Sequence, residues 1–72
     1  MKLKASHFRA LDRMEREGAV IGPRRSIPLA ELVGAGYARR WGHVIMTNAV
    51  YTLTPEGRMA LDVERAMRVP VE

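Results

Sequence analysis

The chain has 72 residues, a net charge of +4 and no cysteine. A chain of this length forms one domain at most and buries only about 60% of the surface that its unfolded form exposes, so a partner or a second copy would help to stabilise it. Hydrophobic residues make up 47% of the sequence, too large a share for a disordered chain, and the lack of cysteine excludes disulfides and thiolate metal sites.

Positive charge is concentrated in the middle of the chain. Residues 21–44 contain four basic residues and one acidic residue, whereas residues 45–72 have a net charge of −1. Such a basic segment is typical of nucleic-acid binding, and the alternative interpretation is a solvated surface. The first residues lead into alternating charges rather than an apolar run, so we expect neither a signal peptide nor a membrane span, and a cytoplasmic location.

Residues 6–17 are predicted to form the first helix. Apolar side chains recur there at three-residue steps, at Phe8, Leu11 and Met14. Charged residues four positions apart favour two ion pairs, Asp12 with Arg16 and Arg13 with Glu17. Gly18 suits a left-handed cap that ends the helix, and residues 19–21 are predicted to form a short strand.

A second helix is predicted over residues 27–35 and a β-hairpin over residues 37–53. Ser26 can cap this helix, which has an inward face of Leu29, Leu32 and Val33. In the hairpin, the favoured turn is Thr47-Asn48 between strands of residues 37–46 and 49–53, although Gly42 also permits a bulge or an earlier bend.

The last helix is predicted over residues 55–68. Thr54 has the hydroxyl of an N-cap, Pro55 suits the first helical position, and Glu56 favours the positive end of the helix dipole. The spacing of apolar residues predicts a core face of Met59, Val63, Ala66 and Met67. Leu61 is then expected to point away from the core, either as a lone exposed leucine or as part of a dimer seam.

The predicted fold is therefore α+β, in the order helix, short strand, helix, hairpin and helix. Two segments, LVGAGYARR at residues 32–40 and YTLTPEGR at residues 51–58, resemble the second half of a winged helix-turn-helix domain of the MarR-like and PadR-like kind. In those regulators a recognition helix is followed by a wing hairpin, whose second strand runs into a Leu-Thr-x-x-Gly-Arg helix start. The resemblance covers residues 29–62, and its most specific part is the Leu-Thr-Pro-Glu-Gly-Arg join.

The resemblance implies a small DNA-binding transcriptional regulator, of the kind that bacteria and their phages encode, which acts as a homodimer through its last helix. The residues expected to contact duplex DNA lie at the head of the second helix and on the wing: Arg24, Arg25, Ser26, Arg39, Arg40, His43 and Asn48. For each arginine the alternative is a side chain that only keeps a small protein soluble, and for Asn48 an ordinary turn residue.

The first half departs from the family pattern, because only about nine residues separate Gly18 from the helix that holds Leu29 and Leu32. One helix of the complete domain is missing or is reduced to a turn, although that helix normally braces the reading helix on the DNA backbone. The alternative function is therefore a protein-binding adaptor or inhibitor, for example one encoded by a phage, that keeps the winged scaffold without binding DNA.

Other chemistry finds little support in the sequence. His7 and His43 have no cysteine partners and no acidic residue at ligand spacing, so no metal site is expected. No catalytic triad order or phosphate-binding loop is present, so we expect neither an enzyme nor a cofactor. Trp41 can be a core plug, a stacking surface or an interface anchor, and we expect it to pack against the last helix because so small a core needs its largest apolar side chain.

Overall fold

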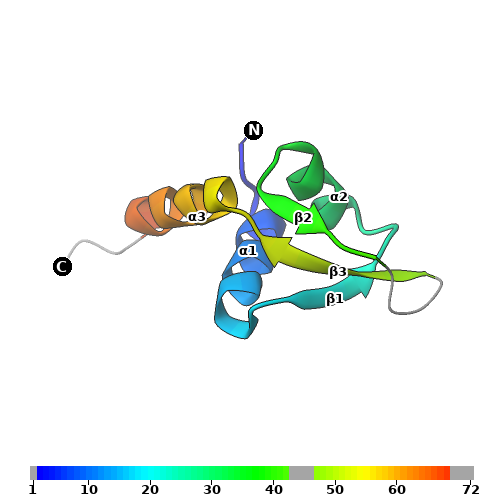
Figure 1. Cartoon of the computed structure of the whole chain (residues 1–72). Helices are drawn as coiled ribbons and strands as arrows, with labels where there is room; N and C mark the ends of the chain where they lie inside the picture. The colour runs from blue at the N-terminus through cyan, green and yellow to red at the C-terminus, as the bar shows by residue number, and fades with distance from the viewer. Residues whose placement is uncertain (1, 43–46, 69–72) are drawn as a thin grey trace.

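A computed structural model of the chain describes residues 2–42 and 47–68. The elements are α1 (Ala5–Glu17), β1 (Val20–Pro23), α2 (Ile27–Gly34), β2 (Ala38–Arg40), β3 (Asn48–Leu53) and α3 (Pro55–Arg68). This is the α+β order that the sequence predicts. The strands form one antiparallel sheet in the order β1-β3-β2, with β3 in the middle (Figure 1). None of the helices in the described ranges is long and apolar enough to cross a membrane.

Some element ends differ from those expected. The first strand covers Val20–Pro23 rather than residues 19–21, and α2 ends at Gly34. Asn48, expected in the turn, is a strand residue that pairs with Pro23 of β1. That pairing extends β3 because the amide of Arg24, just after β1, also donates to the carbonyl of Thr47 at 2.8 Å. The first strand of the hairpin, β2, covers Ala38–Arg40 rather than residues 37–46, of which residues 43–46 lie outside the described residues.

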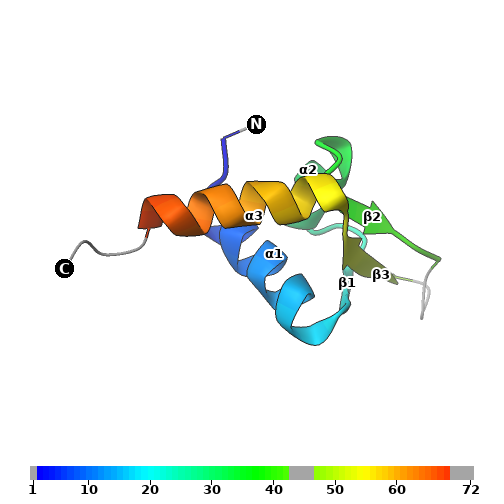
Figure 2. The ribbon, with the colours of Figure 1, turned by 60° about the vertical axis from the view of Figure 1, so that its left-hand side comes forward.

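The core lies between the inner face of the sheet and the helices α1 and α2. Tyr51, in the middle of β3, is completely buried, and its hydroxyl donates to the carbonyl of Pro23 at 3.4 Å. The helices contribute the apolar faces that the sequence predicts, with Leu11 and Met14 from α1 and Leu29 and Leu32 from α2 all buried. Helix α3 leaves the sheet and lies across α1 (Figure 2).

Local signals set the ends of α1 and α2 as expected. Gly18 ends α1 with a φ of 82°, a left-handed conformation that glycine adopts without a Cβ penalty. The hydroxyl of Ser26 accepts a hydrogen bond from the amide of Leu29 at 3.4 Å at the start of α2. The two predicted ion pairs of α1 are also present, Arg13 with Glu17 at 3.0 Å and Arg16 with Asp12 at 3.1 Å.

The join between β3 and α3 is fixed by Thr54. Its hydroxyl donates to the carbonyl of Gly36 at 2.6 Å and accepts from the amide of Gly57 at 2.9 Å, which makes it the N-cap that the sequence predicts. Its own amide donates to the carbonyl of Tyr37 at 3.3 Å. Gly57 is buried there, and a Cβ at this position would lie 1.9 Å from the Tyr37 carbonyl oxygen. The Leu-Thr-Pro-Glu-Gly sequence therefore allows α3 to begin in direct contact with the backbone that follows α2.

The predicted core face of α3 is wrong. Leu61 is completely buried in the core cluster, whereas Met59, Val63 and Met67 are 69%, 59% and 76% exposed. Ala66 is exposed as well. Helix α3 carries apolar residues on two faces, so spacing alone does not select one. The face that packs on α1 is the one that also carries Arg65, whose guanidinium bonds carboxylates of α1.

The close approach at Gly57 generates a stability prediction. We expect Gly57→Ala to lower the free energy of unfolding by at least about 3 kcal/mol, because a methyl group would displace the backbone at Tyr37. The matched control is Gly34→Ala at the end of α2, where no atom lies within 4 Å of the added Cβ. The control should stay within about 1 kcal/mol of wild type. Urea denaturation measures both, and equal stabilities of the two variants would contradict the assigned contact.

Candidate nucleic-acid interface

Basic and acidic residues are separated along the fold. The segment 18–55, from the end of α1 to the start of α3, holds four arginines and one glutamate, and so carries +3 of the net charge of +4. The glutamate, Glu31, accepts a hydrogen bond from His7 of α1 at 2.9 Å. Every other acidic residue belongs to the segments that contain α1 and α3 or to the C-terminal end. The end of the molecule formed by the sheet and α2 is therefore the basic end.

Five of the six arginines of α1 and α3 form ion pairs, and Arg9 of α1 forms none within the described residues. Arg65 of α3 bonds both Asp12 and Glu15 of α1, and Arg58 reaches Glu15 at 3.3 Å. The hydrogen bond from Arg65 lowers the pKa of Asp12 below its ordinary value, with help from the charge of Arg16. The same hydrogen bond raises the pKa of Arg65. Arg58 and Arg65 therefore form ion pairs between α3 and α1 that hold the two helices together.

The arginines of the basic end have a different environment. Arg25 is exposed in the turn before α2, and Arg39 and Arg40 are exposed on β2. Within the described residues, no carboxylate forms an ion pair with any of these three. The two arginines of β2 lie against rings: the guanidinium of Arg39 lies 4.6 Å from the ring centroid of Trp41, and that of Arg40 lies 5.7 Å from the ring centroid of Tyr51.

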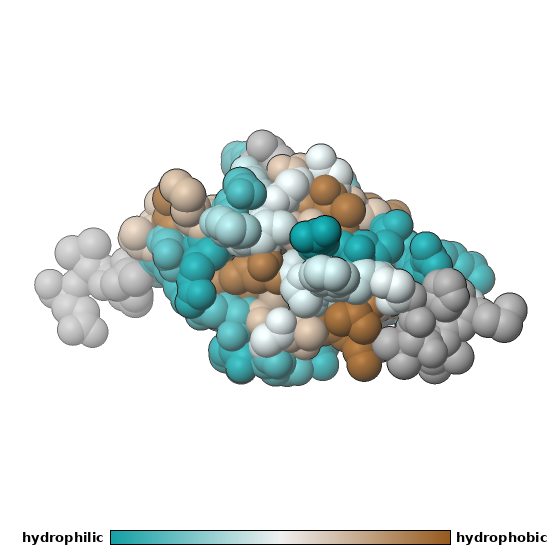
Figure 3. Space-filling view, viewed as in Figure 1, coloured by the Kyte–Doolittle hydropathy of each residue, from teal (hydrophilic) through white to brown (hydrophobic). Residues whose placement is uncertain are grey.

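The sheet determines how the predicted site residues are placed. Arg24, Arg25 and Ser26 follow β1 directly, and Asn48 pairs with the last residue of that strand, so these four residues lie at one end of the sheet. Arg39 and Arg40 lie on the opposite edge strand, where Arg40 pairs with Tyr51. Hydrophilic side chains gather where the turn before α2 meets the sheet (Figure 3). His43 lies outside the described residues.

One arginine pair follows the edge strand β1 and the other lies on the edge strand β2, so the register of the sheet gives the distance between the two places. The rows Pro23–Asn48 and Tyr51–Arg40 are three residues of β3 apart, which is roughly 10 Å along the strand. The middle strand adds about 10 Å across the sheet, since neighbouring strands lie about 4.8 Å apart. The backbones of Pro23, just before Arg24 and Arg25, and of Arg40 are thus about 14 Å apart.

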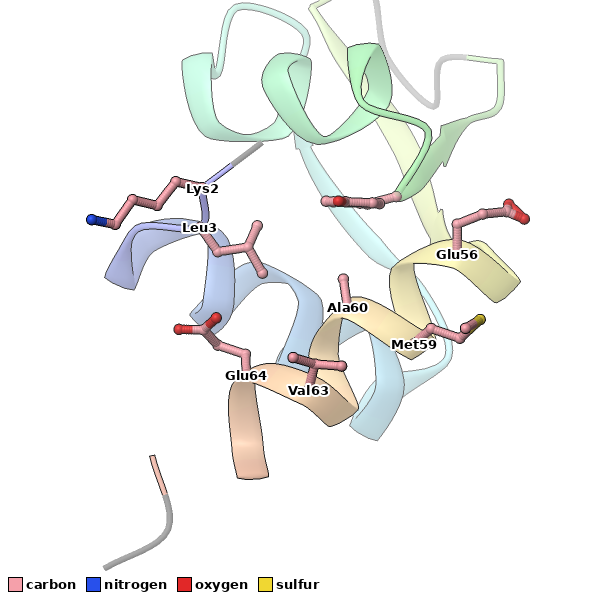
Figure 4. Close-up of a pocket in the computed structure, with 8 residues that line it drawn as sticks. Lys2, Leu3, Glu56, Met59, Ala60, Val63 and Glu64 are labelled. Carbon is pink, nitrogen blue, oxygen red and sulfur yellow. The ribbon is translucent and has the colours of Figure 1, made fainter. Parts of the chain in front are cut away.

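A second candidate surface lies on α3. Met59 and Val63 line a groove with Leu3 of the N-terminal segment and with Tyr37, and Leu3 points toward Val63 (Figure 4). Met67 continues the same exposed stripe one turn later. Three exposed large apolar residues at spacings of four on one helix exceed the isolated exposed side chains that need no explanation. We call Met59, Val63 and Met67 the α3 stripe.

Sequence reasoning missed two side chains that the fold places together. His7 is almost fully buried, and its Nδ1 accepts a hydrogen bond from the backbone amide of Lys4 at 2.9 Å. Because Nδ1 is the acceptor, the hydrogen-bond network assigns the proton to Nε2, which donates to Glu31. No spacing signal links these residues, since 24 positions separate them. In the described ranges, no group of three or more His, Cys, Asp or Glu side chains is arranged to hold a metal ion.

The expected role of Trp41 in the core is wrong. Its residue surface is 49% exposed, and its indole Nε1 donates to the hydroxyl of Thr52 at 2.6 Å. Tyr51 fills the centre of the core instead, so the fold does not need the tryptophan there.

Comparisons of the chain with protein-family models, with curated proteins and with solved structures found no significant match in any of the three.

The Asp12–Arg65 contact generates a pH-dependent prediction. Since the folded-state pKa of Asp12 is lowered, its contribution to stability is present above the unfolded-state pKa of about 3.9 and is lost as the pH falls through the folded-state value. We therefore expect Asp12→Asn to lower the melting temperature at pH 7 but not at about pH 2. Circular dichroism melts measure this, with Asp62→Asn as an exposed control on α3. An equal loss for Asp12→Asn at both pH values would contradict the assigned ion pair.

Proposed function

We propose that the chain is a small DNA-binding protein with a winged-helix-like fold, and that it acts as a transcriptional regulator on duplex DNA. The observed order of helices and strands is compatible with that fold, and the wing corresponds to β2 and β3. The proposal rests on one observation above all, the separation of charge. Five of the six arginines of α1 and α3 are held by carboxylates, whereas Arg25, Arg39 and Arg40, and on α1 only Arg9, form no ion pair within the described residues.

The separation of the two arginine pairs supports duplex DNA as the ligand. The backbones of Pro23, which precedes the first pair, and of Arg40 in the second pair are about 14 Å apart, comparable to the roughly 12 Å width of the major groove. The turn before α2 and the strand β2 can then contact phosphates on opposite sides of one groove. The head of α2 would face the bases between them, with Ser26 and Asn48 near the phosphates.

The α3 stripe supports the second part of the proposal, a homodimer. A two-fold interface uses the same patch on both copies, so an apolar stripe on one helix can pair with itself in antiparallel orientation. Such a pairing would bring Glu56 at the start of α3 toward Arg68 at the end of the partner's α3, which is favourable for both charges. Two basic ends would then be presented to successive grooves of the DNA.

Loss of duplex binding tests the main proposal. We expect Arg24→Ala with Arg25→Ala to weaken binding of a labelled mixed-sequence duplex, measured by fluorescence anisotropy, and to reduce the slope of log K against log salt by about 2. Removal of two phosphate contacts is the physical reason. In the wild type, binding should weaken steeply between low and near-physiological salt.

The matched control is Arg13→Ala with Arg16→Ala, which removes the same two charges from exposed positions on α1. It should leave most of the affinity in place. Equal losses in the two double variants would show that only net charge matters, and no binding at low salt would refute DNA binding itself. The alternative, a protein-binding adaptor or inhibitor, would then be tested by using the protein as bait to isolate a protein partner.

A separate measurement tests the homodimer. We expect sedimentation velocity to show a dimer for the wild type and a monomer for Met59→Glu with Val63→Glu, because two buried carboxylates would oppose association. Both side chains are exposed in the single chain, so the fold should persist by circular dichroism. Ile27→Glu, at an apolar position 70% exposed on α2, is the control that should remain dimeric. A wild type that is monomeric at high concentration would contradict the dimer.

A further inference from the structure

Trp41 is an exposed aromatic side chain held in a fixed orientation. It is the only tryptophan of the chain, and 49% of its surface is exposed. The only hydrogen-bond donor of its side chain, Nε1, already donates to the hydroxyl of Thr52 at 2.6 Å. Orientation of the ring is therefore fixed by the sheet and does not require a ligand.

The sheet places a cation beside this ring. Arg39 pairs with Thr52 in the β2–β3 register, and Ala38 before it is buried, so Arg39 projects from the outer face of the sheet. Its guanidinium lies 4.6 Å from the centroid of the Trp41 ring. Arg40 pairs with the buried Tyr51 and therefore projects from the other face. The outer face thus combines one aromatic ring with one cation, Arg39, that no described carboxylate neutralises.

The outer face also carries apolar groups that no described element covers. Ile21 of β1 is 58% exposed and pairs with Val50 of β3, which is partly exposed. Figure 3 shows a hydrophobic patch over β1 on this side of the molecule. An aromatic ring, apolar neighbours and an adjacent cation are the components of surfaces on which unpaired bases stack.

We propose that Trp41 is a stacking platform for one unpaired base of a single-stranded nucleic acid, and that Arg39 contacts a phosphate beside that base. Bases inside a duplex are stacked on one another, so only a single strand, a strand end or an opened base pair offers a free face. This inference rests on the proposed nucleic-acid binding and extends it, because it assigns a second form of ligand to the outer face of the sheet.

The single tryptophan makes a direct test possible. An oligothymidylate of about 12 nucleotides is titrated into the full chain at low salt, and the tryptophan emission is followed together with the anisotropy of the labelled oligonucleotide. We expect quenching of the emission in parallel with binding, since all of the tryptophan signal comes from Trp41. A duplex titrated in the same way should bind with much less quenching.

Variants separate stacking from other contributions. Trp41→Ala should weaken oligothymidylate binding by about 5- to 150-fold, the range that corresponds to loss of one base–aromatic stack, and should leave duplex affinity nearly unchanged. Trp41→Phe should restore part of the loss because it keeps a ring. Ile21→Ala, which removes an exposed apolar side chain from the same face, is the matched control and should have little effect. Circular dichroism checks that each variant is folded.

Three outcomes would overturn the platform, and they differ in what they say of the proposed function. Oligothymidylate binding without quenching, unaffected by Trp41→Ala, refutes the platform and leaves nucleic-acid binding in place. Equal weakening of duplex and single-strand binding by Trp41→Ala also refutes it, because stacking on an unpaired base is selective. No binding of either nucleic acid refutes both proposals, and the exposed ring would then be a protein contact.

Discussion

The hydroxyl of Thr54 connects three parts of the fold: the turn after α2, the end of β3 and the start of α3. It donates to the carbonyl of Gly36 after α2, it accepts from the amide of Gly57 in α3, and its own residue ends β3. The glycine is required because the first turn of α3 lies against the backbone carbonyl of Tyr37. Once this join is made, the direction of α3 is fixed, and the helix reaches α1 with Leu61 facing the core.

The direction of α3 also determines which charged side chains form ion pairs with one another. Lying across α1, it brings Arg65 to Asp12 and Glu15, so acidic and basic residues of the two helices neutralise one another. The sheet and the head of α2 contain no comparable set of carboxylates, since Glu31 is the only acidic residue between residues 18 and 55. Arg25, Arg39 and Arg40 therefore have no carboxylate partner in the described part of the chain, which supports a polyanion as the ligand. The α3 stripe is left on the opposite side of the same helix, where a second copy is the proposed occupant.

The sequence predicted the features that depend on neighbouring residues and failed where distant residues decide. The order of the elements, the caps at Ser26 and Thr54 and the ion pairs within α1 follow from local spacing and side-chain chemistry. The buried face of α3 does not, because Leu61 and the α3 stripe are both apolar and the choice depends on carboxylates of α1 some fifty positions away. Trp41 was assigned to the core on size alone, although Tyr51 occupies that place. The pairing of His7 with Glu31 likewise joins two helices and leaves no pattern in the sequence.

Chemical-shift mapping of backbone amides with a short duplex tests the central claim, the use of the basic end as a nucleic-acid interface, most directly. A ¹⁵N-labelled sample is titrated with the duplex at low salt, and each amide shift is followed residue by residue. The account predicts that the largest shifts fall on residues 24–28 and 38–42, with residues 47–52 next and the interface between α1 and α3 nearly unchanged. Shifts confined to α1 and α3, or no shifts at all at high protein concentration, would contradict it.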